Sequence, residues 1–82
     1  MDDPLVVQSR LDLAAFVDSL SADLESNPAD WENATLPAFL DALARYLNDL
    51  PGWCRNVAPD IDPELAQWRL MAVALTGASV YE

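Results

Sequence analysis

The residue types on which most enzymes depend are scarce in this sequence. Histidine and lysine are absent, and Cys54 is the one cysteine. Without histidine the chain lacks the usual general base at neutral pH and the usual partner of a nucleophilic serine or cysteine. A single cysteine can form neither an internal disulfide nor a cysteine-based metal site. The composition therefore predicts a protein that is not an enzyme and holds no cofactor and no metal.

Carboxylates are the remaining reactive groups, and their spacing favours structural roles. An acid–base pair needs one carboxyl group whose pKa is raised by burial or by a neighbour. Asp60 and Asp62 are close in sequence, but Asp62 is better placed as a helix cap. Residues 60–64 are also too short for a calcium loop and lack its turning glycine. Arg55 beside Cys54 favours a lower thiol pKa, but with no base nearby we expect an incidental thiol.

The charge of the chain points to a protein partner. Fourteen acidic residues against four arginines give a net charge of −10. This charge repels nucleic acids and anionic membranes and attracts basic protein surfaces. Residues 1–41 hold nine of the acids and one arginine. We expect a partner with a basic surface, no nucleic acid and no membrane; the alternative is that the charge serves solubility alone.

The same features predict a cytoplasmic location. Met1-Asp2-Asp3-Pro4 is acidic where a signal peptide carries positive charge. The longest apolar stretch, residues 70–75, is far shorter than the ~20 residues needed to cross a bilayer.

Two amphipathic helices are predicted in the first two thirds of the chain. The first spans residues 10–25, with Ser9 as N-cap, and ends before Pro28. The second starts after the capping residue Thr35 and ends at Pro51-Gly52. Their apolar residues repeat at helical spacing: Leu13, Phe16, Val17, Leu20 and Leu24 in the first; Leu36, Phe39, Leu40, Leu43, Leu47 and Leu50 in the second. A short helical turn is expected between them, around residues 28–33.

A third helix is predicted from the cap at Asp62 to Val80, after a loop over residues 53–61. Pro63 suits its first position and Glu64 its positive end. This helix is apolar nearly all round, which is typical of a central helix or of one that packs on a second chain. Leu70, Val73 and Val80 would form the flank used in a homodimer. The expected fold is an all-α, compact three-helix domain over residues 1–82, with residues 1–8 flexible or loosely packed.

The candidate partner-binding residues are acids of the first helix and aromatic residues with their neighbours. The acids of the first helix are more simply a solvated face. Trp31 more simply fills the gap between the first two helices, and Trp53 more simply serves core and loop packing. Asn33 or Glu32 would then cap a turn. The full set is Asp12, Asp18, Asp23, Glu25, Trp31, Glu32 and Trp53.

The sequence resembles a bacterial family of small single-domain proteins of unknown function. The resemblance spans about residues 11–82 and rests on Asn27-Pro28, Trp31-Glu32-Asn33, Thr35-Leu36, Phe39-Leu40 and Ala42-Leu43, and on a closing helix with Trp68 that ends in Tyr81-Glu82. It implies a mainly helical fold and carries over no activity and no catalytic residues. The absence of lysine departs from the family pattern.

These observations favour a small acidic protein-interaction module, most concretely an immunity-like or antitoxin-like inhibitor of a basic protein. Carboxylates would steer the encounter and an aromatic side chain would anchor it. The alternative is a homodimeric structural or accessory protein that uses the flank of the third helix.

Overall fold

Three α-helices account for most of residues 3–81, which the computed structural model describes. They are α1 (Arg10–Ser26), α2 (Leu36–Val57) and α3 (Trp68–Val80). Two 3-10 turns complete the fold, η1 (Pro4–Val6) before α1 and η2 (Pro28–Asp30) between α1 and α2. The prediction of an all-α, three-helix domain with a short helical turn between the first two helices is confirmed.

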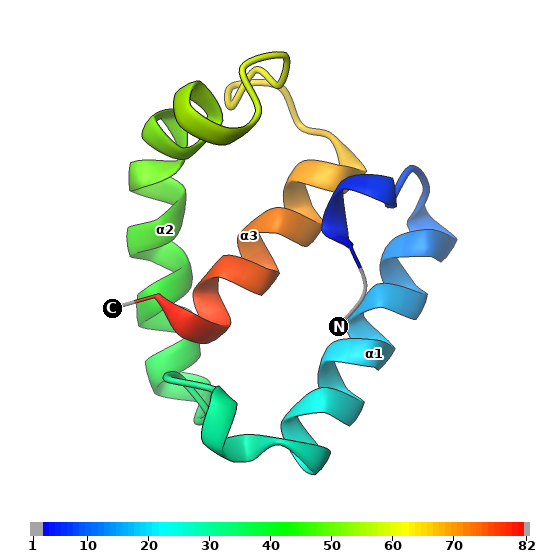
Figure 1. The fold of residues 1–82 in the computed structure, drawn as a ribbon, viewed down its shortest axis with the longest axis vertical. Helices are drawn as coiled ribbons and strands as arrows, with labels where there is room; N and C mark the ends of the chain where they lie inside the picture. Colours follow the sequence, from blue (N-terminus) through cyan, green and yellow to red (C-terminus); the bar gives the residue numbers. More distant parts are fainter. Residues whose placement is uncertain (1–2, 82) are drawn as a thin grey trace.

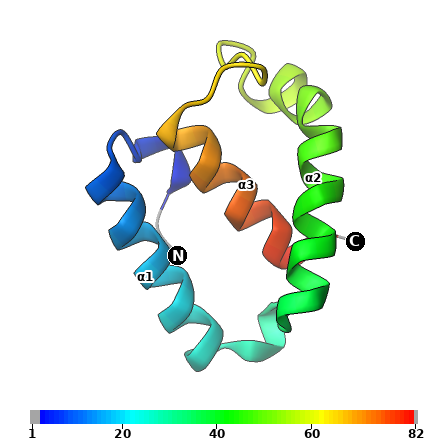
Figure 2. The same cartoon turned by 180° about the vertical axis from the view of Figure 1, so that it is seen from behind.

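Helix α3 lies between the other two, with α1 on one side and α2 on the other (Figures 1 and 2). One core cluster joins α2 and the following loop to α3 and contains Leu50, Cys54, Ala58, Ile61, Leu70 and Val73. A second joins α1 to α3 and contains Val7, Phe16, Leu20 and Ala72. Because α3 buries residues in both clusters, it is a central helix, which is one of the two alternatives that its apolar character left open. Leu70 and Val73 are therefore not a free flank, whereas Val80 is exposed.

The predicted helix starts at Ser9 and Thr35 are confirmed. The Ser9 hydroxyl accepts the Asp12 N–H at 3.0 Å, and the Thr35 hydroxyl accepts the Ala38 N–H at 3.4 Å. These side chains satisfy N–H groups that have no partner within the first turn of a helix. Helix α1 ends at Ser26, before Pro28 as expected.

The prediction that Pro51-Gly52 ends the second helix is wrong, because α2 continues to Val57 with Pro51 inside it. A proline in a helix removes one hydrogen bond and costs about 3 kcal/mol. The residues on either side of the proline offset this cost: Leu50 and Cys54 are buried, and Trp53 packs against the same cluster. Leu50, Trp53 and Cys54 stand at i, i+3 and i+4, so the helical pattern does continue past the proline.

The prediction that the third helix starts at Asp62 is also wrong, because α3 starts at Trp68. Asp62 does cap a turn, since its carboxylate accepts the Glu64 N–H at 2.9 Å and its carbonyl accepts the Leu65 N–H at 3.2 Å. The turn goes no further. Leu65 is 56% exposed, so a helix here would bury no apolar face, and good capping alone rarely sustains a helix.

Residues 4–7 pack against the domain, contrary to the prediction that the N-terminal segment over residues 1–8 is flexible or loosely packed. Turn η1 contacts α3, Val7 is buried, and Leu5 packs against the cluster around Leu50. Asp3 starts the turn by accepting the Leu5 N–H at 2.9 Å. Apolar burial of Leu5 and Val7 thus holds residues 4–7 against the domain, and residues 1 and 2 lie outside the described part of the chain.

Candidate functional site

The distinctive corner at residues 31–33 joins all three helices, and two of its side chains are used internally. The Trp31 indole N–H donates to Asp23 of α1 at 2.8 Å, and its ring lies 6.2 Å from the Phe39 ring of α2. Trp31 also packs against the α1–α3 core cluster. The indole therefore fixes the corner between α1 and α2, as the simpler interpretation held.

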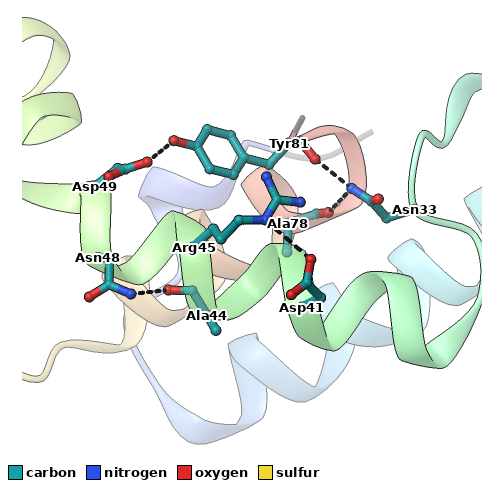
Figure 3. Close-up of polar contacts among 8 residues, drawn as sticks. All are labelled: Asn33, Asp41, Ala44, Arg45, Asn48, Asp49, Ala78 and Tyr81. Atoms are coloured by element: carbon teal, nitrogen blue, oxygen red, sulfur yellow. Dashed lines mark hydrogen bonds and ion pairs between the residues drawn. The ribbon is translucent and has the colours of Figure 1, made fainter.

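Asn33 closes the C-terminal end of α3 (Figure 3). Its side-chain amide donates to the carbonyls of Ala78 at 2.9 Å and Tyr81 at 2.8 Å, and its backbone N–H donates to the Ser79 carbonyl at 3.0 Å. The last carbonyls of a helix have no partner within the helix itself. Asn33 supplies that partner from a distant segment, so the corner also locks α3 in place. Glu32, between Trp31 and Asn33, is exposed.

The hydrogen bond from the indole has a measurable electrostatic effect. The Trp31 N–H, and after it the Asn27 amide, hold the pKa of Asp23 below its ordinary value of 3.8. Because the pKa of Asp23 is lower in the folded protein than in the unfolded chain, its ionised form stabilises the fold at pH values above the unfolded-state pKa. This stabilisation is lost as the pH falls through the folded-state pKa.

We therefore expect Trp31→Phe to raise the pKa of Asp23 toward its ordinary value, because phenylalanine fills much of the volume but donates no hydrogen bond. A pH titration of the Asp23 side-chain carbon by NMR measures this change. The matched variant Asn27→Ala removes the second donor and is expected to raise the same pKa by less. An unchanged Asp23 pKa in Trp31→Phe would contradict the assigned role of the indole.

A second cluster of side chains, largely exposed, surrounds Tyr81, and its polar contacts were not predicted from the sequence (Figure 3). The Tyr81 hydroxyl donates to the Asp49 carboxylate, and Arg45 lies with its guanidinium carbon 5.6 Å from the Tyr81 ring centre. The Tyr46 and Tyr81 rings meet edge to face at 5.1 Å. Arg45 also pairs with Asp41 one turn earlier, at 3.2 Å. The cluster ties the end of α3 to the middle of α2.

The acids predicted for partner binding divide into two groups. Asp23 is engaged by Trp31 and Asn27, and Asp12 accepts the Gln8 N–H at 3.1 Å beside its helix cap. Asp18 and Glu25 are exposed on α1. Of the predicted acids of α1, Asp12 and Asp23 thus have structural contacts, while Asp18 and Glu25 lie on the exposed surface.

The remaining predicted anchor, Trp53, is half-buried against the α2–α3 core cluster and serves that cluster. Cys54 beside it is buried, and burial raises the pKa of its thiol. A thiol with a raised pKa is a weak nucleophile, which fits the expectation of an incidental cysteine.

An apolar groove lies along α2, with α1 and the corner lining one end and α3 the other. It consists of two pockets, of about 350 and 220 Å³. Leu75 of α3 lines both, so the two pockets adjoin. The larger is lined by Val17, Leu20, Ser21, Leu24, Trp31, Asn33, Ala34, Thr35, Leu36, Phe39 and Leu75. The smaller is lined by Leu43, Leu47, Leu70, Met71, Ala74 and Leu75.

Sequence reasoning assigned much of this groove to the core. Leu36 and Leu47 of the lining are 69% and 51% exposed, and Leu40, which lies between them on α2 without lining either pocket, is 53% exposed. All three belong to the apolar stripe predicted for the second helix. The reason is the arrangement of the helices: α1 packs on α3 and not over the stripe of α2. Helix α2 meets α3 through Leu50 and Cys54 instead. Spacing shows that a stripe is apolar, but it does not show how much of it a neighbour covers.

Acidic residues border the groove on the side of α1, although none of them lines it. None of the side chains that line the two pockets is charged. Ser21 lines the larger pocket, and Asp18 and Glu25 stand three residues before it and four after it on α1. Residues at these spacings are neighbours on a helix surface. The exposed carboxylates of α1 therefore border the groove on that side.

Two further features are absent from residues 3–81. No three acidic, histidine or cysteine side chains in this range lie close enough together to hold a metal ion. Within the same range, no helix is long and apolar enough to span a bilayer.

Comparison with known proteins places the chain in a family but assigns it no activity. No curated protein matches the sequence, and no solved structure matches it. The family of unknown function DUF7660 matches residues 9–82, which includes all three helices and the corner at residues 31–33. The chain belongs to the DUF7660 family of unknown function.

Proposed function

We propose that this protein is a small acidic interaction module whose groove binds a basic protein, in the manner of an immunity-like or antitoxin-like inhibitor. The observation that carries the proposal is the exposure of Leu36, Leu40 and Leu47 beside two adjoining apolar pockets. Contiguous exposed apolar surface of this kind marks interaction sites in monomeric proteins. Completing the burial of each half-exposed leucine would contribute about 1 kcal/mol to binding.

The charge of the chain supports a basic partner. A net charge of −10 attracts cationic surfaces over several ångströms and speeds their encounter. Asp18 and Glu25 bring that charge to the edge of the groove. In this proposal the groove leucines take the anchoring role that the sequence assigned to Trp31 and Trp53, which serve the fold.

An affinity capture from a lysate of the source organism tests the proposal, with the captured proteins identified by mass spectrometry. Four baits are compared: the wild type, Leu36→Gln with Leu47→Gln, Asp18→Asn with Glu25→Gln, and the control Leu11→Gln. Leu11 is 66% exposed on α1 and does not line the groove. Glutamine keeps good helix propensity in each case, and circular dichroism confirms that each bait is folded.

We expect the wild type and Leu11→Gln to capture the same basic protein. The groove variant should lose it, and either the acid variant or raised salt should weaken its capture, because salt screens exposed charges. A basic protein captured equally well by the groove variant would refute the role of the groove. Self-association detected by light scattering, with no other protein captured, would favour the homodimeric accessory protein instead.

A further inference from the structure

We infer that the occupant of the groove is an amphipathic helix of the partner with a cationic flank, lying along α2 and placing one apolar side chain in each pocket. This inference rests on the proposed function and names the chemistry of the segment that the groove recognises. Three properties of the groove bear on this inference: the spacing of its two pockets, the scarcity of backbone groups with which a peptide could pair, and the negative charge at its edge.

The spacing of the two pockets fits a helix. Along α2 the larger pocket is lined by Leu36 and Phe39, and the smaller by Leu43 and Leu47. Equivalent leucines, Leu36 and Leu43, are seven residues apart, which is about 10 Å at 1.5 Å per residue. Two side chains at i and i+7 on a bound helix have the same separation. Same-face residues of a strand recur near 7 and 14 Å, so a strand would fit one pocket and miss the other.

The chemistry of the groove also favours a helix over an extended peptide. Its lining consists mainly of aliphatic and aromatic side chains. Most of them are carried by helices, whose backbone groups are largely bonded within those helices; Trp31, Asn33, Ala34 and Thr35 come from the segment that precedes α2. An extended peptide would bury N–H and C=O groups there without partners, at a cost in free energy. A helix satisfies its own backbone and presents only side chains to the groove. The span from Leu36 to Leu47 matches about three helical turns.

The charge decides between a cationic partner and a second copy of this chain. Asp18 and Glu25 stand beside Ser21 of the pocket wall, where lysine or arginine on the flank of a bound helix would meet them. A second copy would bring another net charge of −10 to the same surface, and like charges oppose that association. The complementary occupant is therefore apolar on one face and basic beside it.

Synthetic peptides of about 14 residues test the inference on the full-length protein. The probe is a labelled amphipathic helix with leucines at i and i+7 and lysines along one flank. A second peptide has the same composition in scrambled order, and a third carries glutamate in place of lysine. Fluorescence anisotropy measures the affinity of each for the wild type, for Leu36→Gln with Leu47→Gln, for Asp18→Asn with Glu25→Gln, and for Leu11→Gln.

We expect the cationic helix to bind the wild type and the Leu11→Gln control equally, and to lose at least tenfold in affinity on the groove variant. The acid variant should lose a few-fold and show a flatter salt dependence. The scrambled and glutamate peptides should bind at least tenfold more weakly than the cationic helix. Equal binding of the scrambled peptide, or affinity unchanged in the groove variant, would overturn the inference. So would a wild-type dimer that the groove variant abolishes and that the peptide fails to displace.

The peptide experiment and the lysate capture distinguish failure of the helical occupant from failure of the proposed function. If the lysate yields a basic protein whose capture depends on the groove, but the helical peptide does not bind, the proposed function stands and the helical occupant is refuted. If the peptide binds as expected and the lysate yields no basic protein, the chemistry of the groove stands and the proposed function is refuted.

Discussion

Replacing Gly77 by alanine is expected to lower the free energy of unfolding by about 3 kcal/mol or more, the upper range for overpacking a tight contact. An alanine Cβ at this position would lie 2.7 Å from Tyr46 Cε1 and closer still to two other atoms of the same ring. These atoms belong to a half-buried ring held between α2 and Tyr81, not to the end of a flexible side chain. Moving the ring would disturb its packing against the core cluster around Leu50 and its edge-to-face contact with Tyr81.

The consequence should be large because an 82-residue chain has a small margin of stability, about 3–5 kcal/mol. Urea unfolding followed by circular dichroism measures the loss. A double-mutant cycle provides the control: in a Tyr46→Ala background, Gly77→Ala should become neutral or stabilising, because alanine is the better helix former by about 1 kcal/mol. An equal loss in both backgrounds would show that the contact with Tyr46 is not the cause.

The second large effect is expected at Asn33. Asn33→Ala removes both donors to the Ala78 and Tyr81 carbonyls and should cost about 2 kcal/mol, the range for leaving partly buried polar groups unsatisfied. Asn33→Asp should cost more at neutral pH, because a carboxylate would face carbonyl oxygens in place of an amide donor. The aspartate variant should then regain stability as the pH falls and the carboxyl becomes protonated.

Asn56→Ala is the matched control for this prediction. Asn56 is exposed on α2, and replacing it should change stability by less than about 0.5 kcal/mol. Urea unfolding of the three variants at neutral and acidic pH separates the effects. An Asn33→Ala variant as stable as Asn56→Ala would contradict the clamp on α3, and an Asn33→Asp variant without pH dependence would contradict its electrostatic part.

Features governed by neighbouring residues were predictable from the sequence. Ser9 and Thr35 cap their helices as their types and positions indicate, and Pro28 follows the end of α1. The same local rules failed where burial at a distance decided the structure. Pro51 lies inside α2 because Leu50 and Cys54 gain a core, whereas the well-capped turn at Asp62 ends early because Leu65 has nothing to cover it.

The candidate site was predictable only in its residue types. The sequence identified an acidic first helix and an apolar stripe on the second, and both contribute to the groove. It could not show that α3 would separate α1 from α2 and leave Leu36, Leu40 and Leu47 exposed. Nor could it show that Asp23 and Trp31 would bond to each other. Both facts depend on tertiary arrangement, which periodicity does not encode.

Site-specific photocrosslinking tests most directly whether the groove is the binding surface. A benzophenone amino acid is placed at position 40 on the exposed stripe of α2, or at position 11 on α1 as the control, and mass spectrometry identifies the crosslinked segment in a lysate. We expect an adduct from position 40 and not from position 11. The crosslink should lie on a segment that is apolar at i and i+7 and carries lysine or arginine beside that face. Adducts from position 11 alone, or a crosslink from position 40 to a second copy of this chain, would contradict this role of the groove.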